Sequence, residues 1–254
     1  MGRIIAIANQ KGGVGKTTTA INLSACLAEA GKRVLTVDLD PQGNTTSGLG
    51  VNKNEQEKTT YELLIGQSSV EECLLKEVLP GLDILPSNIE LSGAEIELIG
   101  IEGKEFILKE EIDKIRSNYD FVLIDCPPSL NMLTVNAMTT ADTVLVPIQC
   151  EYYALEGLSQ LIHTINLVKQ RLNPSLELEG VVFTMYDSRT NLSLQVVENV
   201  KNNLNNAVYK TIIPRNVRLA EAPSHGKPIT LYNPRSVGAE SYRLLAKEVI
   251  QRGD

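Results

Sequence analysis

Cysteine is scarce in this chain and follows no pattern. The four cysteines, Cys26, Cys73, Cys126 and Cys150, lie far apart and include no C-x-x-C pair. A zinc ribbon needs such pairs, and a disulfide framework is typical of short, cysteine-rich secreted chains. We therefore expect neither kind of structure and predict buried, reduced thiols.

Targeting and membrane signals are also missing. The sequence shows no signal peptide and no apolar run close to the ~18 residues that a membrane helix needs, and Ala6 stands where a myristoylation signal has Ser or Thr. The first expected strand begins at residue 3 and the last expected helix ends near residue 251, which leaves no room for an N-terminal helix-turn-helix domain or an added amphipathic tail. We expect a cytoplasmic protein with no membrane partner.

A general excess of positive charge is absent, because the net charge is −7. This value argues against a polycationic nucleic-acid binder, but the charge is unevenly distributed. Residues 1–188 carry 14 Lys and Arg against 26 Asp and Glu (−12), whereas residues 189–254 carry 10 against 5 (+5). The last quarter is therefore locally basic, and local charge decides contact with nucleic acid more than the sum does.

Apolar, β-branched stretches alternate with helical patterns along the 254 residues. The alternation predicts βα units and therefore an α/β fold, a twisted, mainly parallel sheet with helices on both faces, as one domain over residues 1–254. Residues 50–60 are expected to form an exposed loop. Helices are expected over 102–117 and over about 238–251, where Tyr242, Leu244, Leu245, Val249 and Ile250 would pack on the sheet. Strands are expected at about 3–9, 33–38, 82–86, 120–125, 143–148, 180–185 and 209–213.

The segment Lys11–Thr18, KGGVGKTT, stands between the first expected strand and a helical pattern. Its glycines allow backbone N–H groups to turn toward a polyphosphate, and the helix that begins near Gly15 directs its positive end to the same place. Lys16 would reach the β- and γ-phosphates, and the Thr17 hydroxyl would bind Mg²⁺. The loop departs from the general G-x-x-x-x-G-K-[ST] pattern, because Gln10 replaces the first glycine and Lys11 adds a second lysine.

Two other expected strands end in acidic residues. One finishes with Asp38 and Asp40, and the other finishes with Asp125 before Cys-Pro-Pro-Ser. Ligands of open parallel sheets bind beyond the carboxyl ends of the strands, so these carboxylates should meet the phosphate loop. We expect Asp125 to hold Mg²⁺ directly or through water, Asp38 to support Mg²⁺ and the loop lysines, and Asp40 to orient water on a mobile loop.

Lys11 stands early enough in the loop to act outside its own chain. If two copies meet face to face, this lysine can reach the partner's nucleotide, and Gly12 permits close approach of the backbones. Phosphoryl transfer depends mostly on positioning and charge neutralisation, so hydrolysis would then depend on dimerisation.

Five segments together resemble the ParA/Soj family of chromosome- and plasmid-partitioning ATPases, P-loop NTPases of the MinD/ParA superfamily with a deviant Walker A loop. The resemblance runs from residue 2 to about 250 and suggests the short, chromosomal type. The segments are Lys11–Thr18, Val37–Asn44, Leu123–Ser129, Gln149–Leu158 and Ile213–Pro228.

The resemblance implies a Mg²⁺-dependent ATPase whose ATP-bound sandwich homodimer binds double-stranded DNA without sequence preference. It also implies association with the nucleoid and stimulation by a ParB-type centromere-binding protein. By motif, the catalytic residues are Lys11, Lys16 and Asp40, the metal is held by Thr17, Asp38 and Asp125, and DNA is bound by Arg189 and Arg218. The nucleotide is bound by Lys11, Gly12, Gly13, Val14, Gly15, Lys16, Thr17 and Thr18, with Met185, Pro214 and Asn216 beside adenine.

Two other functions share this nucleotide site. A MinD-like membrane-cycling ATPase would need a basic, amphipathic C-terminal helix, which residues 250–254 do not supply. An iron–sulfur carrier would need paired cysteines where two subunits meet, and Cys126 and Cys150 lack that arrangement.

Overall fold

The computed structural model of the chain describes residues 2–151, 154–204 and 207–253. Its centre is an eight-stranded sheet in the order β3-β4-β2-β5-β1-β6-β7-β8. β3 runs antiparallel to β4, and every other neighbouring pair is parallel. The strands are β1 (Arg3–Ile7), β2 (Val34–Asp38), β3 (Leu75–Leu79), β4 (Leu82–Leu85), β5 (Phe121–Asp125), β6 (Thr143–Gln149), β7 (Glu177–Tyr186) and β8 (Val208–Pro214). The seven predicted strands are confirmed, whereas β3 was not predicted.

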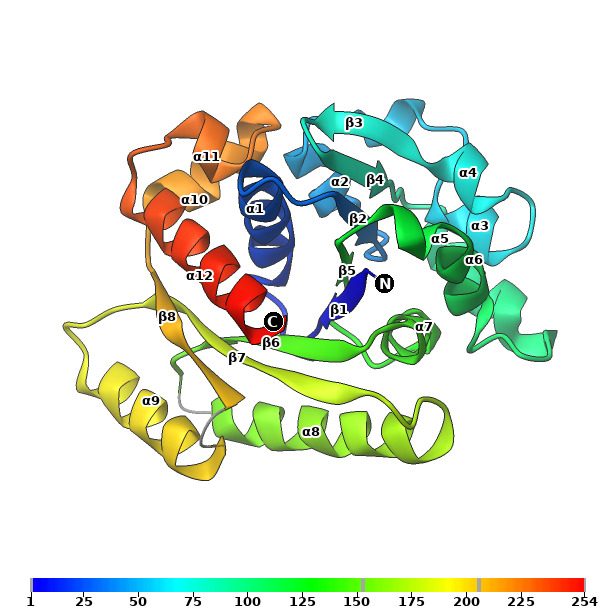
Figure 1. Ribbon diagram of the computed structural model, residues 1–254. Helices are drawn as coiled ribbons and strands as arrows, with labels where there is room; N and C mark the ends of the chain where they lie inside the picture. The colour runs from blue at the N-terminus through cyan, green and yellow to red at the C-terminus, as the bar shows by residue number, and fades with distance from the viewer. Residues whose placement is uncertain (1, 152–153, 205–206, 254) are drawn as a thin grey trace.

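Helices cover both faces of the sheet (Figure 1). Successive residues of β1 show the division: Ile4 and Ala6 belong to the core under α3 to α9, and Ile5 and Ile7 to the core under α1 and α10 to α12. The main helices are α1 (Lys16–Glu29), α2 (Asn44–Gly48), α3 (Thr60–Leu64), α4 (Val70–Cys73), α5 (Leu91–Glu97), α6 (Ile107–Ile115), α7 (Met132–Thr140), α8 (Ala154–Arg171), α9 (Asn191–Leu204), α10 (Val217–Glu221), α11 (Ile229–Tyr232) and α12 (Val237–Gly253). Short 3₁₀ turns are η1 (Lys53–Glu55), η2 (Leu98–Gly100), η3 (Arg116–Asn118) and η5 (Ala222–His225). The predicted α/β architecture is therefore confirmed.

Two expectations about local packing need correction. In α12, Tyr242, Leu245 and Val249 are buried at helical spacing, but Leu244 is 50% exposed because it lies on the opposite side of the helix. The expected exposed loop 50–60 contains η1 and ends in two fully buried threonines, Thr59 and Thr60, where α3 begins.

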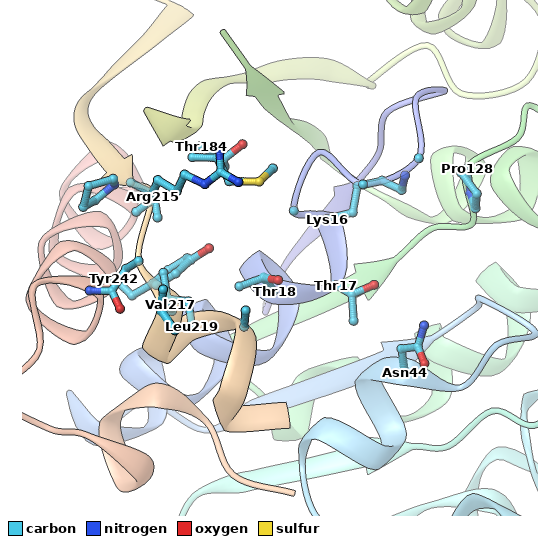
Figure 2. A pocket seen from close by; sticks show the side chains of 18 of the residues that line it. Lys16, Thr17, Thr18, Asn44, Pro128, Thr184, Arg215, Val217, Leu219 and Tyr242 are labelled. Carbon is cyan, nitrogen blue, oxygen red and sulfur yellow. The ribbon is translucent and has the colours of Figure 1, made fainter. Parts of the chain in front are cut away.

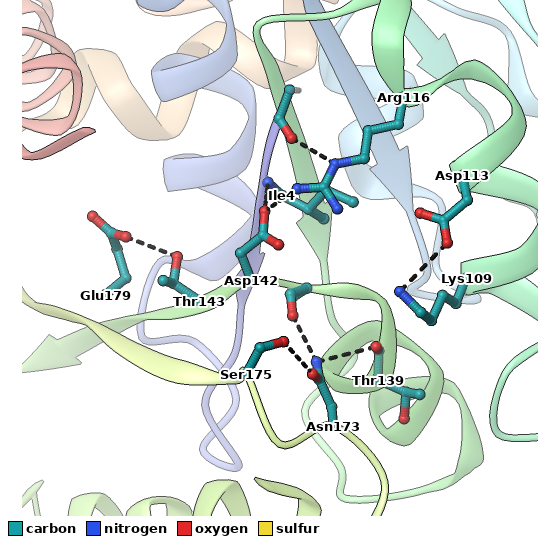
Figure 3. A network of polar contacts seen from close by, with 12 residues as sticks. Ile4, Lys109, Asp113, Arg116, Thr139, Asp142, Thr143, Asn173, Ser175 and Glu179 are labelled. Atoms are coloured by element: carbon teal, nitrogen blue, oxygen red, sulfur yellow. Dashed lines mark hydrogen bonds and ion pairs between the residues drawn. The ribbon is translucent and has the colours of Figure 1, made fainter. Parts of the chain in front are cut away.

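The amino edge of the sheet is held by polar side chains (Figure 3). The Asp142 carboxylate accepts hydrogen bonds from the Ile4 N–H at 2.8 Å and from Arg116 Nη2 at 2.6 Å. Asn173 Nδ2 donates to three carbonyls at the end of α7, at 2.8–3.1 Å. These contacts fix β1 and β6 at one end and leave the carboxyl ends of the strands free to form a site. Across the described residues, no helix combines the length and hydropathy needed to span a bilayer.

Candidate functional site

The loop between β1 and α1 has a backbone that requires glycine at two points. Gly13 and Gly15 have φ angles of 74° and 89°, in the left-handed region that other L-residues adopt at a cost. Gly15 caps α1, so the helix begins at Lys16 with its free N–H groups facing the loop. The glycine spacing in the sequence thus produces the concave turn that the phosphate hypothesis requires.

Two side chains outside the predicted set fix this loop. Asn9 Nδ2 donates to the Pro147 carbonyl at 2.8 Å, while its Oδ1 accepts from the Lys11 N–H at 3.0 Å. Thr184, near the end of β7, donates to the Val14 carbonyl at 2.7 Å. Sequence reasoning missed both residues; an Asn directly after a buried strand is a weak signal, and Thr184 gives none.

A cavity of about 620 Å³ opens beside the loop, at the carboxyl edge of the sheet. In Figure 2, Lys16, Thr17, Asn44 and Pro128 lie toward one end, and Arg215, Val217, Leu219 and Tyr242 toward the other. The first end is polar and the second largely apolar, which suits a ligand with phosphates at one end and a flat ring at the other. The predicted residues that line the cavity are Gly12, Gly13, Gly15, Lys16, Thr17, Thr18, Asp40, Met185, Pro214 and Asn216.

Lys16 is a nearly buried cation, with 6% of its surface exposed. Burial lowers the pKa of its ammonium group, and the negative charges of Asp125 and Asp40 oppose that shift. Its Nζ donates to the Lys11 carbonyl at 3.1 Å. The lysine therefore points back along the loop, where it can meet an anion held by the loop N–H groups.

Asp125 ends β5 beneath this cation and is fully buried. Thr45 donates to its Oδ2 at 2.7 Å, whereas Oδ1 is buried without a hydrogen-bond partner among the described residues. The Thr17 hydroxyl lowers the pKa of this carboxyl. Burial first, and then the charge of Asp38, raise the pKa to about 7. An unpartnered buried carboxylate oxygen beside a threonine hydroxyl fits a hard divalent cation such as Mg²⁺.

Across the described residues no group of three or more His, Cys, Asp or Glu could hold a metal. A cation at Thr17 and Asp125 would therefore need further oxygen ligands from phosphate or water, as Mg²⁺ commonly has.

Asp38 is fully buried, and both of its carboxylate oxygens are engaged by the protein. Oδ1 accepts from the Asp40 N–H at 3.2 Å, and Oδ2 accepts from the N–H and hydroxyl of Thr46 at 2.8 and 2.7 Å. Burial raises the pKa of Asp38 to about 6, against the lowering effect of the Thr46 bonds. The structure thus shows Asp38 holding its own loop, and its role at a metal stays a prediction.

Lys11, Gly12 and Gly13 are exposed at the tip of the loop. The Lys11 ammonium forms an ion pair with Glu151 on the surface. Among the described residues, only Pro128 Cβ would lie within 4 Å of a Cβ on Gly12, at 3.9 Å, and the φ of Gly12 is not positive. Neither packing against the described residues nor backbone conformation therefore explains a glycine at position 12.

Arg189 and Arg218 follow neighbouring strands. β7 and β8 are parallel, with Tyr186 opposite Pro214, so both arginines lie beyond the same edge of the sheet. The side chain of Arg189 is 85% exposed and lies 2.6 Å from Asp187, and that of Arg218 is 53% exposed and lies 2.7 Å from Glu221. Exposed pairs of this kind contribute little to stability, so an incoming phosphate can replace the acid at small cost.

The predicted adenine-bordering residues come from the ends of β7 and β8. Met185 has a φ of 48°, unusual for a residue with a side chain, and Asn216 caps α10 by accepting from the Arg218 N–H at 2.8 Å. Sequence reasoning missed three further residues that line this part of the cavity, Val217, Leu219 and Tyr242. Tyr242 comes from α12, the last helix, so no local pattern indicates its place in the site.

Comparison with known proteins supports the interpretation of this cavity as a nucleotide site. A family model described as an AAA domain matches residues 2–178. The sporulation initiation inhibitor protein Soj of Bacillus subtilis is 58% identical over 253 residues, covering 100% of both chains. The chromosome partitioning protein ParA of Myxococcus xanthus is 54% identical over 252 residues, covering 99% of this chain and 89% of its own. A crystal structure of cobyrinic acid a,c-diamide synthase from Mycobacterium smegmatis, with bound ADP and magnesium, superimposes with a TM-score of 0.87 at 40% identity, covering 100% of this chain and 96% of that one.

The fold and the glycine-rich loop before α1 define a P-loop NTPase with a second lysine in its phosphate loop. The full-length similarity to Soj and ParA narrows that class. The chain belongs to the ParA/Soj family of chromosome-partitioning ATPases.

Proposed function

We propose that this protein is a Mg²⁺-dependent ATPase of chromosome or plasmid partitioning, whose ATP-bound dimer holds DNA and releases it after hydrolysis. One observation carries the proposal: a cavity large enough for a nucleotide is lined by the predicted phosphate loop, by Asp40 and by the three predicted adenine-bordering residues. The two relatives named as Soj and ParA, similar over nearly the whole chain, support the role in partitioning.

ATP fits the polarity of the cavity. The loop N–H groups and Lys16 bind the phosphates, and Val217, Leu219 and Tyr242 provide an apolar surface for the base. Thr17 and Asp125 would hold Mg²⁺, whose positive charge would neutralise the phosphates. The related cobyrinic acid a,c-diamide synthase structure, which holds ADP and magnesium, supports the proposal that this chain binds a nucleotide together with Mg²⁺.

Hydrolysis requires a water molecule held in line with the γ-phosphate. Asp40 lines the cavity and keeps 8% of its surface exposed, which gives it access to that water. Its Oδ1 accepts from the Gln42 N–H at 2.9 Å, which orients the group. We assign to Asp40 the positioning of the attacking water.

The exposed tip of the phosphate loop supports the proposed dimer. Gly12 leaves space that none of the described residues fills, and Lys11 stands beside it on the surface. A second copy that approaches Gly12 brings its own Lys11 to this cavity, and the added positive charge stabilises the charge that develops during phosphoryl transfer. Lys11 must first exchange its exposed pair with Glu151 for the partner's nucleotide.

The basic last quarter of the chain supports the proposed binding of DNA. Arg189 and Arg218 stand beyond one sheet edge with exposed guanidinium groups, which contact phosphates without reading sequence. A dimer doubles the number of these contacts, so DNA affinity depends on the nucleotide state. A ParB-type centromere-binding protein would then stimulate hydrolysis and release the ATPase from the nucleoid.

The cysteines argue against an iron–sulfur carrier, because all four are buried, free thiols and such a carrier needs paired cysteines where two subunits meet. For the MinD-like alternative, sedimentation with anionic vesicles in ATP is decisive: recovery of the protein with the vesicles would favour membrane cycling over DNA binding.

Asp40→Ala tests the proposed function. The variant keeps the phosphate loop and Lys16, so it should bind ATP normally, turn over at least tenfold more slowly, and accumulate as a DNA-bound dimer. Turnover is measured by phosphate release and the dimer by light scattering, with Asp113→Ala, an exposed acid of α6, as the control. Wild-type turnover in Asp40→Ala would remove the role of Asp40.

A further inference from the structure

The backbone of Asp40 is held at both of its polar groups. Its N–H donates to Asp38 Oδ1 at 3.2 Å, and its carbonyl accepts from Ser87 Oγ at 2.8 Å. Ser87 follows β4, the strand beside β2, and lies 47 residues along the chain from Asp40. The peptide units around Asp40 are therefore attached to a neighbouring strand end as well as to their own.

Thr46 closes these contacts into a ring. Its hydroxyl donates to Asp38 Oδ2 at 2.7 Å and accepts from the Ser87 N–H at 2.9 Å. The ring thus runs from Asp40 to Asp38, Thr46, Ser87 and back to Asp40. Asp38, Thr46 and Ser87 are fully buried, where bonds to a carboxylate are strong and a lost partner is costly.

The loop is also packed tightly on Ser87. A Cβ on Gly43 would lie 2.6 Å from the Ser87 carbonyl oxygen, so only glycine permits the observed approach. Gly43 has a φ of 58°, and its N–H donates to the Asp40 carbonyl at 2.8 Å. The Asp40 carbonyl therefore accepts two bonds, which leaves its peptide plane little freedom to rotate.

We propose that Thr46 and Ser87 are positioning residues for ATP hydrolysis, because they fix the backbone from which the Asp40 carboxylate enters the cavity. The inference rests on the proposed role of Asp40. Neither Thr46 nor Ser87 lines the cavity, so they act through Asp40 and not on the nucleotide. Small displacements of a water-positioning group reduce the rate far more than they reduce substrate affinity.

The decisive variant is Thr46→Val, which keeps the shape of the side chain and removes the hydroxyl. Its turnover should fall about 10–100-fold, while affinity for a non-hydrolysable ATP analogue stays within about twofold. Thr46→Ser keeps the hydroxyl and should restore turnover to near wild type. The matched control is Thr140→Val, which removes a comparably buried hydroxyl from α7. The Thr140 hydroxyl donates to the Asn136 carbonyl at 2.7 Å. Thr140→Val should lower the melting temperature without lowering turnover.

Ser87→Ala removes the hydroxyl that donates to the Asp40 carbonyl, and this variant keeps the test decisive if Thr46→Val fails to fold. It should also lower turnover at nearly constant analogue affinity. In an Asp40→Ala background, Thr46→Val and Ser87→Ala should have no further effect on the residual rate, because the group that they position is gone.

Three results would overturn the inference. The first is equal turnover in Thr46→Val and Thr46→Ser, and the second is a loss of analogue affinity in Thr46→Val as large as its loss of turnover. The third is that Thr46→Val or Ser87→Ala lowers turnover as much in the Asp40→Ala background as in the wild type. If Asp40→Ala itself hydrolyses ATP normally, the proposed function fails at that step. If Asp40→Ala is slow but Thr46→Val and Ser87→Ala turn over normally, only the positioning role fails.

Discussion

Replacing Arg189 by alanine should change how DNA binding depends on salt. The side chain is 85% exposed and, among the described residues, is bound to Asp187 alone, through Nε at 2.9 Å and Nη2 at 2.6 Å, so its loss leaves the core and the nucleotide cavity intact. If the arginine contacts a phosphate in the complex, the variant releases one counterion fewer for each copy in the dimer.

The size of the effect follows from the number of contacts. Each phosphate contact on duplex DNA contributes about 0.9 to the slope of log affinity against log salt, so two copies of Arg189 account for about 1.8. A fourfold rise in salt, from about 50 to about 200 mM, should therefore cost the wild type about tenfold more affinity than it costs Arg189→Ala. The variant binds more weakly at low salt, and the difference narrows as salt rises.

The assay is fluorescence anisotropy of a random duplex, with a non-hydrolysable ATP analogue, across a salt series. Arg33→Ala is the control, because Arg33 is also exposed and makes a comparable two-nitrogen contact with Asp120, but it precedes β2 at the opposite edge of the sheet. Parallel salt plots for wild type and Arg189→Ala would refute the placement of the DNA surface at the ends of β7 and β8.

The remaining predictions concern the buried charges of the site. Lys16→Ala should lower ATP affinity at least 100-fold in a fluorescent-nucleotide titration, because it removes the nearly buried cation at the phosphate end of the cavity. The control Lys109→Ala, on the exposed face of α6, should leave ATP affinity unchanged. Unchanged ATP affinity in Lys16→Ala would contradict the phosphate-loop assignment. Without nucleotide or metal, the free energy of unfolding should rise as pH falls from about 7.5 to about 5. Burial raises the folded-state pKa values of Asp38 and Asp125 to about 6 and about 7, above the ordinary 3.8. In this pH range the folded chain therefore binds protons that the unfolded chain does not. That stabilisation is complete below the unfolded pKa and lost as pH rises through the folded values; urea titrations should show a weaker pH dependence for Asp125→Asn, and an identical one would exclude the buried pair as its cause.

Much of the fold was accessible from sequence because it depends on local patterns. The central strands are continuous apolar runs, and the alternation with helices indicated their parallel arrangement. β3 was missed because it is an edge strand with Lys76 and Glu77 exposed, a φ of 55° at Glu77 and an irregular register. Its pairing depends on the hairpin with β4, not on an apolar pattern of its own.

The site likewise contains some residues that the sequence predicts and others that depend on tertiary contacts. The glycine-rich loop, Asp40 and Asp125 stand at fixed offsets from strands, so spacing and chemistry sufficed to place them near one edge. The ring through Thr46 and Ser87 joins residues 41 positions apart, and each residue alone has the form of an ordinary polar side chain near a turn. Tyr242 and Thr184 reach the cavity only because α12 packs on α1 and the end of β7 lies beside the phosphate loop. Such contacts arise from tertiary packing and leave no local periodicity.

The most direct test of the account measures DNA binding and mass together on one preparation of the unmodified protein, with ATP, with ADP and without nucleotide. Light scattering and anisotropy at constant salt should show a DNA-bound dimer with ATP that decays to free monomer as ATP is hydrolysed, and little DNA binding in the other two states. Equal DNA binding in all three states, or binding by a monomer, would contradict the proposal that the nucleotide controls DNA through the dimer.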